Sequence, residues 1–83
     1  MNKILIEIEI PVAQKSFEVF LPLHLTGYEV LGLIVKIATE LTDRLFVADD
    51  GVALCRKEDG AILNLNQPLW KLGLINSEKL ILV

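Results

Sequence analysis

The sequence is poor in the residue types from which active sites are usually built. It has one histidine, His24, and one cysteine, Cys55. A single cysteine cannot form an internal disulfide, which is typical of an intracellular protein. We interpret Cys55 as a small apolar side chain and not as a reactive thiol. A lone histidine and a lone cysteine also do not suggest a set of metal ligands.

Other catalytic patterns are missing as well. The five glycines are isolated, so they do not form a phosphate-binding loop. Ser16 and Ser77 fall in predicted turns, where serine is common because it forms local hydrogen bonds. The acidic pairs Asp49-Asp50 and Glu58-Asp59 fall in polar turns and lack the further ligands that calcium needs. We therefore expect no catalytic residues, no metal and no cofactor, and a protein that is not an enzyme.

The chain lacks a positive surface and a long apolar run. Lysine and arginine number 8 against 11 acidic residues, for a net charge of −3, which argues against nucleic-acid binding. The most apolar stretch, Val30 to Ala38, contains Gly32 and Lys36 and is far too short for a membrane span. The first ten residues alternate apolar and acidic and do not form a secretory signal. These features predict a soluble, cytoplasmic protein without direct membrane insertion.

What the sequence does contain is aliphatic residues in regular patterns. Its 83 residues are 53% hydrophobic and only 6% aromatic, which predicts one domain, residues 1–83, with a Leu/Ile/Val core. Isoleucine occupies every second position from Ile4 to Ile10, which predicts a strand with one buried face. Pro11 ends this strand, and Ser16 to Leu21 alternates again. The two runs predict an N-terminal hairpin.

A helix follows the hairpin. Thr26-Gly27-Tyr28-Glu29 has the form of a capping box, so we expect a helix from about Gly27 to Thr42. Its predicted core stripe consists of Val30, Ile34, Ile37 and Leu41. Gly32 lies on the polar side of this helix, where no packing reason for a glycine is evident.

The second half of the chain predicts three short strands, a helical turn and a plug at one end of the core. The plug is Leu45, Phe46 and Val47; the strands are Val52 to Arg56, Ala61 to Leu63 and Leu80 to Val83; the turn runs from Pro68 through Leu69 and Leu72. We expect the last strand to pair with the first, and one helix to cover one face of the sheet.

This order of elements resembles the ubiquitin-like β-grasp superfamily over essentially the whole chain. The resemblance is carried by the hairpin, the helix from Thr26, and Leu69-x-x-Leu72-Gly73-Leu74 leading to Leu80-Ile81-Leu82. It implies an α+β fold: a mixed sheet of four to five strands, one main helix packed on one face and a short helical turn before the last strand.

Within that superfamily, the chain looks most like the small tailless ubiquitin-like proteins of Gram-positive type VII secretion loci. Its acidic, tailless ending and the Leu-Pro-Leu-x-Leu segment from Leu21 to Leu25 are similar to that group. The resemblance implies a cytosolic bacterial adaptor that is an accessory component of the secretion system and acts through contacts with protein partners, among them secretion-machinery components.

The ending of the sequence bears on a second hypothesis. Ubiquitin-like sulfur carriers and conjugated modifiers react through a mobile Gly-Gly tail, whereas this sequence ends in Val83 on a predicted strand. We therefore expect no competence for conjugation. The alternative is a sulfur-carrier or conjugated modifier protein whose Gly-Gly tail is missing from this sequence.

Two candidate protein-binding surfaces emerge from the strand and helix patterns, and the sequence does not choose between them. If Leu80 and Leu82 point inward, an apolar group lies on the outer sheet face, either as a docking patch or as scattered residues covered by a homodimer neighbour. The helix flank carries a second group, which either packs under the Leu45–Val47 connection or forms a docking stripe. We interpret Trp70 as a partial lid on the core. The outer-face residues are Leu5, Ala53, Cys55, Ile81 and Val83, and the flank residues are Tyr28, Leu31 and Val35.

Overall fold

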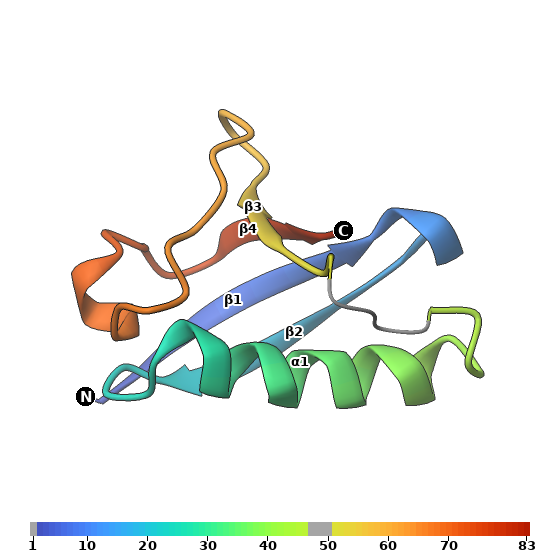
Figure 1. Ribbon diagram of the computed structural model, residues 1–83, viewed down its shortest axis with the longest axis horizontal. Coiled ribbons are helices and arrows are strands. Elements are labelled where there is room, and N and C mark those ends of the chain that lie inside the picture. The colour runs from blue at the N-terminus through green and yellow to red at the C-terminus, as the bar shows by residue number, and fades with distance from the viewer. Residues whose placement is uncertain (1, 47–50) are drawn as a thin grey trace.

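The computed structural model describes residues 2–46 and 51–83, which form four strands, one α-helix and two short 3₁₀ turns. The sheet order is β2-β1-β4-β3, with β1 antiparallel to β2 and parallel to β4, and β3 antiparallel to β4. The helix lies across one face of this sheet (Figure 1). This is the expected α+β arrangement, with the last strand beside the first. The elements are β1 Lys3–Ile10, η1 Pro11–Ala13, β2 Lys15–Pro22, α1 Gly27–Leu41, β3 Leu54–Arg56, η2 Leu69–Lys71 and β4 Glu78–Leu82.

Strand β1 is central and is held on both sides. Its isoleucines are buried on the face toward α1, as their spacing predicts. Just before the start of β4, the Asn76 side chain extends the ladder, because its Oδ1 accepts the backbone N–H of Leu5 at 3.0 Å. The backbone N–H of Ser77 donates to the Leu5 carbonyl at 2.8 Å. The turn before β4 therefore fixes the register of the first and last strands.

The N-terminus of α1 is closed by the expected capping box. The backbone N–H of Glu29 donates to Thr26 Oγ1, while Glu29 Oε1 accepts the Thr26 backbone N–H at 3.0 Å and its hydroxyl at 3.1 Å. These hydrogen bonds, the backbone one foremost, lower the pKa of the Glu29 carboxyl. Two backbone groups that a helix end would leave unpaired are thereby satisfied.

The C-terminal half of α1 departs from the expected stripe. Val30 and Ile34 are buried as predicted, but Leu41 is 39% exposed and Ala38 takes the buried position of the last turns. The Thr42 hydroxyl donates to the Ala38 carbonyl at 2.8 Å and accepts the Phe46 backbone N–H at 3.0 Å. The core therefore closes at this end through Thr42 and the segment after the helix, and not through Leu41.

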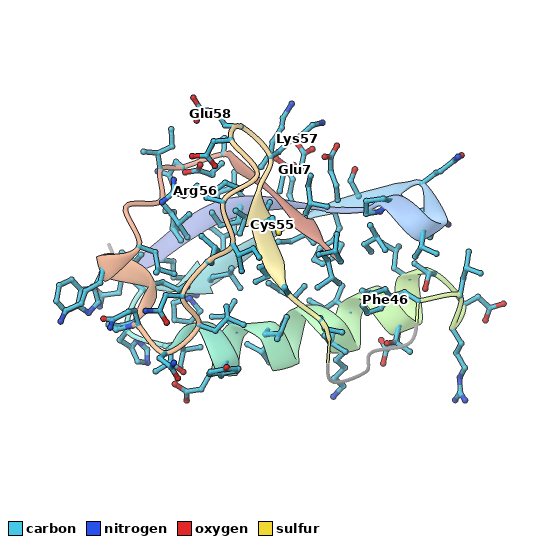
Figure 2. All side chains as sticks on the ribbon, turned by 45° about the horizontal axis from the view of Figure 1, so that its top comes forward. Glu7, Phe46, Cys55, Arg56, Lys57 and Glu58 are labelled. Atoms are coloured by element: carbon cyan, nitrogen blue, oxygen red, sulfur yellow. The ribbon has the colours of Figure 1, made fainter. Side chains whose placement is uncertain are left out.

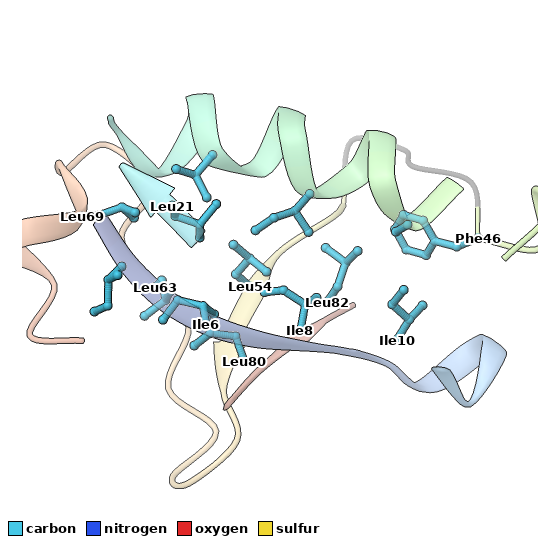
Figure 3. Close-up of a cluster of buried hydrophobic side chains, with 14 residues drawn as sticks. Ile6, Ile8, Ile10, Leu21, Phe46, Leu54, Leu63, Leu69, Leu80 and Leu82 are labelled. Atoms are coloured by element: carbon cyan, nitrogen blue, oxygen red, sulfur yellow. The ribbon is translucent and has the colours of Figure 1, made fainter. Parts of the chain in front are cut away.

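Phe46 fills the end of the core, which confirms part of the predicted plug (Figure 3). Leu45 is exposed, so it does not share that role, and Val47 lies outside the described residues. Figure 3 shows the buried aliphatic side chains gathered between α1 and the sheet. Fully burying one such side chain contributes about 1.5–3 kcal/mol. The labelled members are Ile6, Ile8, Ile10, Leu21, Phe46, Leu54, Leu63, Leu69, Leu80 and Leu82.

The three strands predicted in the second half differ from the structure, and β3 begins at Leu54, two residues later than predicted. The segment Ala61 to Leu63 is not a strand; it pairs with β3 only through the isolated bridge between Ile62 and Cys55 and the backbone hydrogen bonds on either side of that bridge. The last strand runs over Glu78–Leu82 and so begins two residues earlier than predicted.

A buried ion pair fixes the start of β4. Arg56 Nη1 lies 3.2 Å from Glu78 Oε2, and the side chain of Glu78 is only 7% exposed. Arg56 Nη2 also donates to the Leu72 carbonyl, while Glu78 Oε1 accepts the Ile75 backbone N–H at 3.1 Å. The pair therefore ties β3 to the loop between η2 and β4.

Candidate protein-binding surface

Four of the five residues predicted on the outer sheet face are brought together by strand pairing. Cys55 on β3 lies opposite Ile81 on β4. One step along, Ala53 and Val83 exchange two backbone hydrogen bonds of 2.9 and 3.0 Å. Their side chains share the face away from α1, because their strand neighbours Leu54 and Leu82 are buried on the other face.

This group is extended at one edge by a residue that the sequence analysis did not single out. Ile62 forms its isolated bridge with Cys55 and is 72% exposed. Val83 is 56% exposed, whereas Ala53, Cys55 and Ile81 are half-buried. The exposed apolar side chains therefore border a half-buried centre. We call Ala53, Cys55, Ile62, Ile81 and Val83 the β3–β4 patch.

The fifth predicted residue, Leu5, does not belong to this group. Ile81 pairs with Glu9 on β1, whereas Leu5 pairs with Phe20 on β2. The four residues from Leu5 to Glu9 span about 13 Å along the strand. Leu5 shares the outer face as expected, but it forms a separate apolar pair with Phe20.

A charged band separates the two apolar groups. Glu7 and Lys79 lie opposite one another on β1 and β4. Lys57, which follows β3, places its Nζ 2.8 Å from Oε1 of Glu9 and so crosses over β4. Figure 2 labels Glu7 on β1, Cys55 on β3 and Lys57 just after β3. A protein bound at the β3–β4 patch would therefore lie beside these charged residues on one side only.

On the side away from the charges, the patch continues into a shallow hollow. Its volume is about 370 Å³, and the residues that line it are all apolar: Pro11, Val12, Leu45, Phe46, Leu82 and Val83. Val12 is 62% and Leu45 61% exposed. The sequence signal for this hollow is one apolar residue in each of two connections, Val12 and Leu45. Leu45 does not take the core position that its sequence predicts.

The three helix-flank residues differ in exposure. Leu31 and Val35 are half-buried and pack against the core, and only Tyr28 is largely exposed. The Tyr28 backbone N–H donates to the Leu65 carbonyl at 3.0 Å, so the loop around Leu65 covers the start of the helix. Packing under the connection after α1 is only partly described, because Val47 lies outside the described residues.

Trp70 is not a lid on the core. It is 62% exposed on η2, with the ammonium nitrogen of Lys71 5.2 Å from the centroid of its ring. The core residue of that turn is its neighbour Leu69. The Trp70 side chain therefore lies on the solvent-exposed surface, where it is available for contacts.

The remaining polar groups do not converge. His24 is exposed, and within residues 2–46 and 51–83 no three His, Cys, Asp or Glu side chains gather as a metal site would require. No helix of the described part of the chain is long and apolar enough to cross a membrane.

The comparisons with known proteins rest on structure. No protein-family model matches the sequence, and no curated protein does. The ubiquitin-like domain of EccD1, a type VII secretion system protein of Mycobacterium tuberculosis, matches with a TM-score of 0.77 at 20% identity, over 100% of this chain and 99% of that one. The EccD5 ubiquitin-like domain from Mycobacterium xenopi gives 0.80 at 20%, over 100% and 94%.

Two larger assemblies contain the same fold. A chain of the MycP5-free ESX-5 inner membrane complex matches with a TM-score of 0.84 at 17% identity, over 100% of this chain and 21% of that one. A chain from a toluene 4-monooxygenase complex gives 0.75 at 13%, over 98% and 96%. At such identities the likeness establishes the fold and no more.

Proposed function

We propose that this chain, which has the ubiquitin-like β-grasp fold, is a non-catalytic protein-interaction module. Its role would be that of a cytoplasmic adaptor, an accessory component of a bacterial type VII secretion system. The observation that carries this proposal is the β3–β4 patch, a contiguous apolar surface on the outer face of the sheet. Contiguous exposed apolar surface on a small protein typically marks a protein contact.

The geometry of the patch suits a protein partner better than a small ligand. Its half-buried centre, Cys55 and Ile81, is bordered by the exposed Ile62 and Val83. The hollow beside it is shallow and apolar, without the convergent polar groups that orient a small-molecule ligand. A partner could place one or two apolar side chains in this hollow while its rim meets Lys57 and Glu9.

The similarity to ubiquitin-like domains of EccD proteins supports the link to type VII secretion. The match to a chain of an inner membrane complex supports contacts with components of such a machine. Because the fold also occurs within a monooxygenase complex, the fold alone does not decide the partner. The apolar patch and the secretion link must therefore be tested together.

The test combines secretion with site-directed crosslinking. A strain that lacks this protein is complemented with the wild type, with Ile81→Asp, or with Ile75→Asp as control, since Ile75 is an exposed isoleucine in the turn before β4 and outside the patch. We expect Ile81→Asp alone to abolish export of type VII substrates. A photoreactive residue in place of Ile62 should crosslink to a secretion component, and one in place of Glu58 should not.

Two results would overturn the proposal. Normal export by a folded Ile81→Asp variant would show that the function does not need the patch. An adenylate or thiocarboxylate on the chain, seen by intact mass spectrometry after incubation with ATP and an activating enzyme, would instead identify a carrier. Thermal unfolding of both variants verifies that each of them folds.

A further inference from the structure

Among the described strands, β2 is an edge of the sheet, and one side of its backbone pairs with no other described strand. Its one neighbouring strand is β1 (Figure 1). Leu5 uses both its backbone groups toward Asn76 and Ser77, on the β4 side of β1. Because backbone groups alternate in direction along a strand, the residues of β1 that bond to β2 are Ile4, Ile6, Ile8 and Ile10.

The register then identifies the free groups of β2. The partners of those isoleucines, Leu21, Val19, Phe17 and Lys15, direct their backbone N–H and C=O groups toward β1. The residues between them, Ser16, Glu18 and Phe20, direct theirs outward. Within the described part of the chain, nothing hydrogen-bonds to these outward groups. Such a row is a template for an added strand.

The side chains along this edge favour a particular added strand. On the outer face, Glu18 lies directly opposite Glu7, and neither is in an ion pair within residues 2–46 and 51–83. Like charges directly opposite in a sheet repel one another. Beside them Phe20 is 60% exposed, and a phenyl face attracts cations. On the inner face, Phe17 and Val19 are only half-buried at this edge.

We propose that the β2 edge binds an extended segment of a partner protein by strand addition, and that this segment alternates basic and aliphatic residues. Lysine or arginine side chains would lie beside Glu18 and Phe20 on the outer face. The aliphatic side chains between them would cover Phe17 and Val19. This contact uses a different side of the sheet from the β3–β4 patch and does not depend on the function proposed for that patch.

A second copy of this chain fits the same edge poorly. In the antiparallel register that pairs Ser16 with Phe20 of the copy, the two strands overlap from Lys15 to Leu21. That register places Glu18 directly opposite Glu18 of the copy, with a Glu7 beside each. Four carboxylates would then share one face, which disfavours self-association. The charge pattern therefore selects a basic partner over a homodimer.

The test uses a synthetic eight-residue peptide, acetylated and amidated, in which lysine alternates with valine, and a matched peptide in which glutamate replaces lysine. Binding is followed by amide NMR shifts and hydrogen exchange of the full chain. We expect the lysine peptide to slow exchange of the Ser16, Glu18 and Phe20 amides selectively. The glutamate peptide should leave them unchanged, and raising the salt concentration should weaken binding.

A charge reversal sharpens the test. Glu18→Lys should weaken binding of the lysine peptide about tenfold and allow the glutamate peptide to bind, because residue 18 would lie directly beside the charged side chains of the added strand. Glu58→Lys makes the same change of net charge in the turn after β3, and should leave the binding of both peptides unchanged. Unfolding curves identify any variant that does not fold.

Three results would overturn the proposal: exchange protection confined to residues outside β2, equal binding of the two peptides, or equal effects of Glu18→Lys and Glu58→Lys. A concentration-dependent dimer that slows exchange of the β2 amides without any peptide would also overturn it, in favour of self-association.

Discussion

The two faces of this sheet are made by the same strands and obey different rules. On the inner face, the central side chains fill space against α1, and the result is a largely aliphatic layer that is excluded from water. On the outer face, apolar pairs, acidic pairs and an ion pair lie side by side. Substitutions on the inner face therefore test folding, whereas the outer face is free to carry contacts with other molecules.

The contrast is sharpest at two consecutive residues. Arg56 directs its guanidinium to the buried carboxylate of Glu78, while Lys57 reaches Glu9 across the exposed face. Both are ion pairs of a basic residue with a glutamate at a comparable distance, yet their surroundings differ. Burial decides what each contributes, because a buried charge without its partner is costly and an exposed one is hydrated.

The largest expected effect separates the faces directly. Ile8→Ala removes a side chain with 0% exposure from the core and should lower the free energy of unfolding by about 3 kcal/mol. Ile81→Ala, at the half-buried outer face, should lower it by about 1 kcal/mol. Urea unfolding at constant m-value measures both. Equal losses would show that the outer face is as closely packed as the inner one.

The paired charges give the next effect. Arg56→Met keeps most of the apolar stem but leaves Glu78 buried without its cation, and should destabilise the protein by about 2 kcal/mol. Lys57→Met, the neighbouring control, should change the stability by less than about 0.5 kcal/mol. Chemical unfolding of the two variants under one set of conditions provides the comparison. A loss for Arg56→Met no greater than for Lys57→Met would mean that water replaces the missing guanidinium.

Much of this fold could be predicted because its strongest signals are local. The alternation of isoleucine in β1 and the capping box at Thr26 involve residues close in sequence, and both appear as predicted. The exposed Leu41 could not be predicted from a helical wheel. A wheel gives the angle of each residue about the axis, but not which later segment closes the core beneath the last turn, here Phe46.

The surface was predicted less completely than the fold, and Leu5 shows why. Parity along a strand assigns a residue to one face, and Leu5, Cys55 and Ile81 do share the outer face. Which residues are neighbours depends on register between strands that are distant in sequence. That register is set by Asn76 and Ser77 against Leu5, a contact with no counterpart in any local pattern.

The smallest expected effects come from two glycines of α1, which extend the comparison from the sheet to the helix. A Cβ at Gly27 would lie 2.6 Å from Leu65 Cα and 2.8 Å from its Cδ2, whereas a Cβ at Gly32 would meet nothing within 4 Å. Gly27→Ala should therefore cost about 1–2 kcal/mol through forced displacement of the loop around Leu65. Gly32→Ala should instead raise stability by about 0.5–1 kcal/mol, because alanine favours the helix and restricts the unfolded chain.

Thermal and urea unfolding of the two alanine variants measure effects of opposite sign from the same substitution in one helix. The sign of the stability change at Gly32 is the informative part, because no contact among residues 2–46 and 51–83 explains a glycine there. A gain in stability would mean that Gly32 is not required for folding. A loss would contradict the open space around its Cα and show that the outward side of α1 is more constrained than the contrast between inner and outer faces implies.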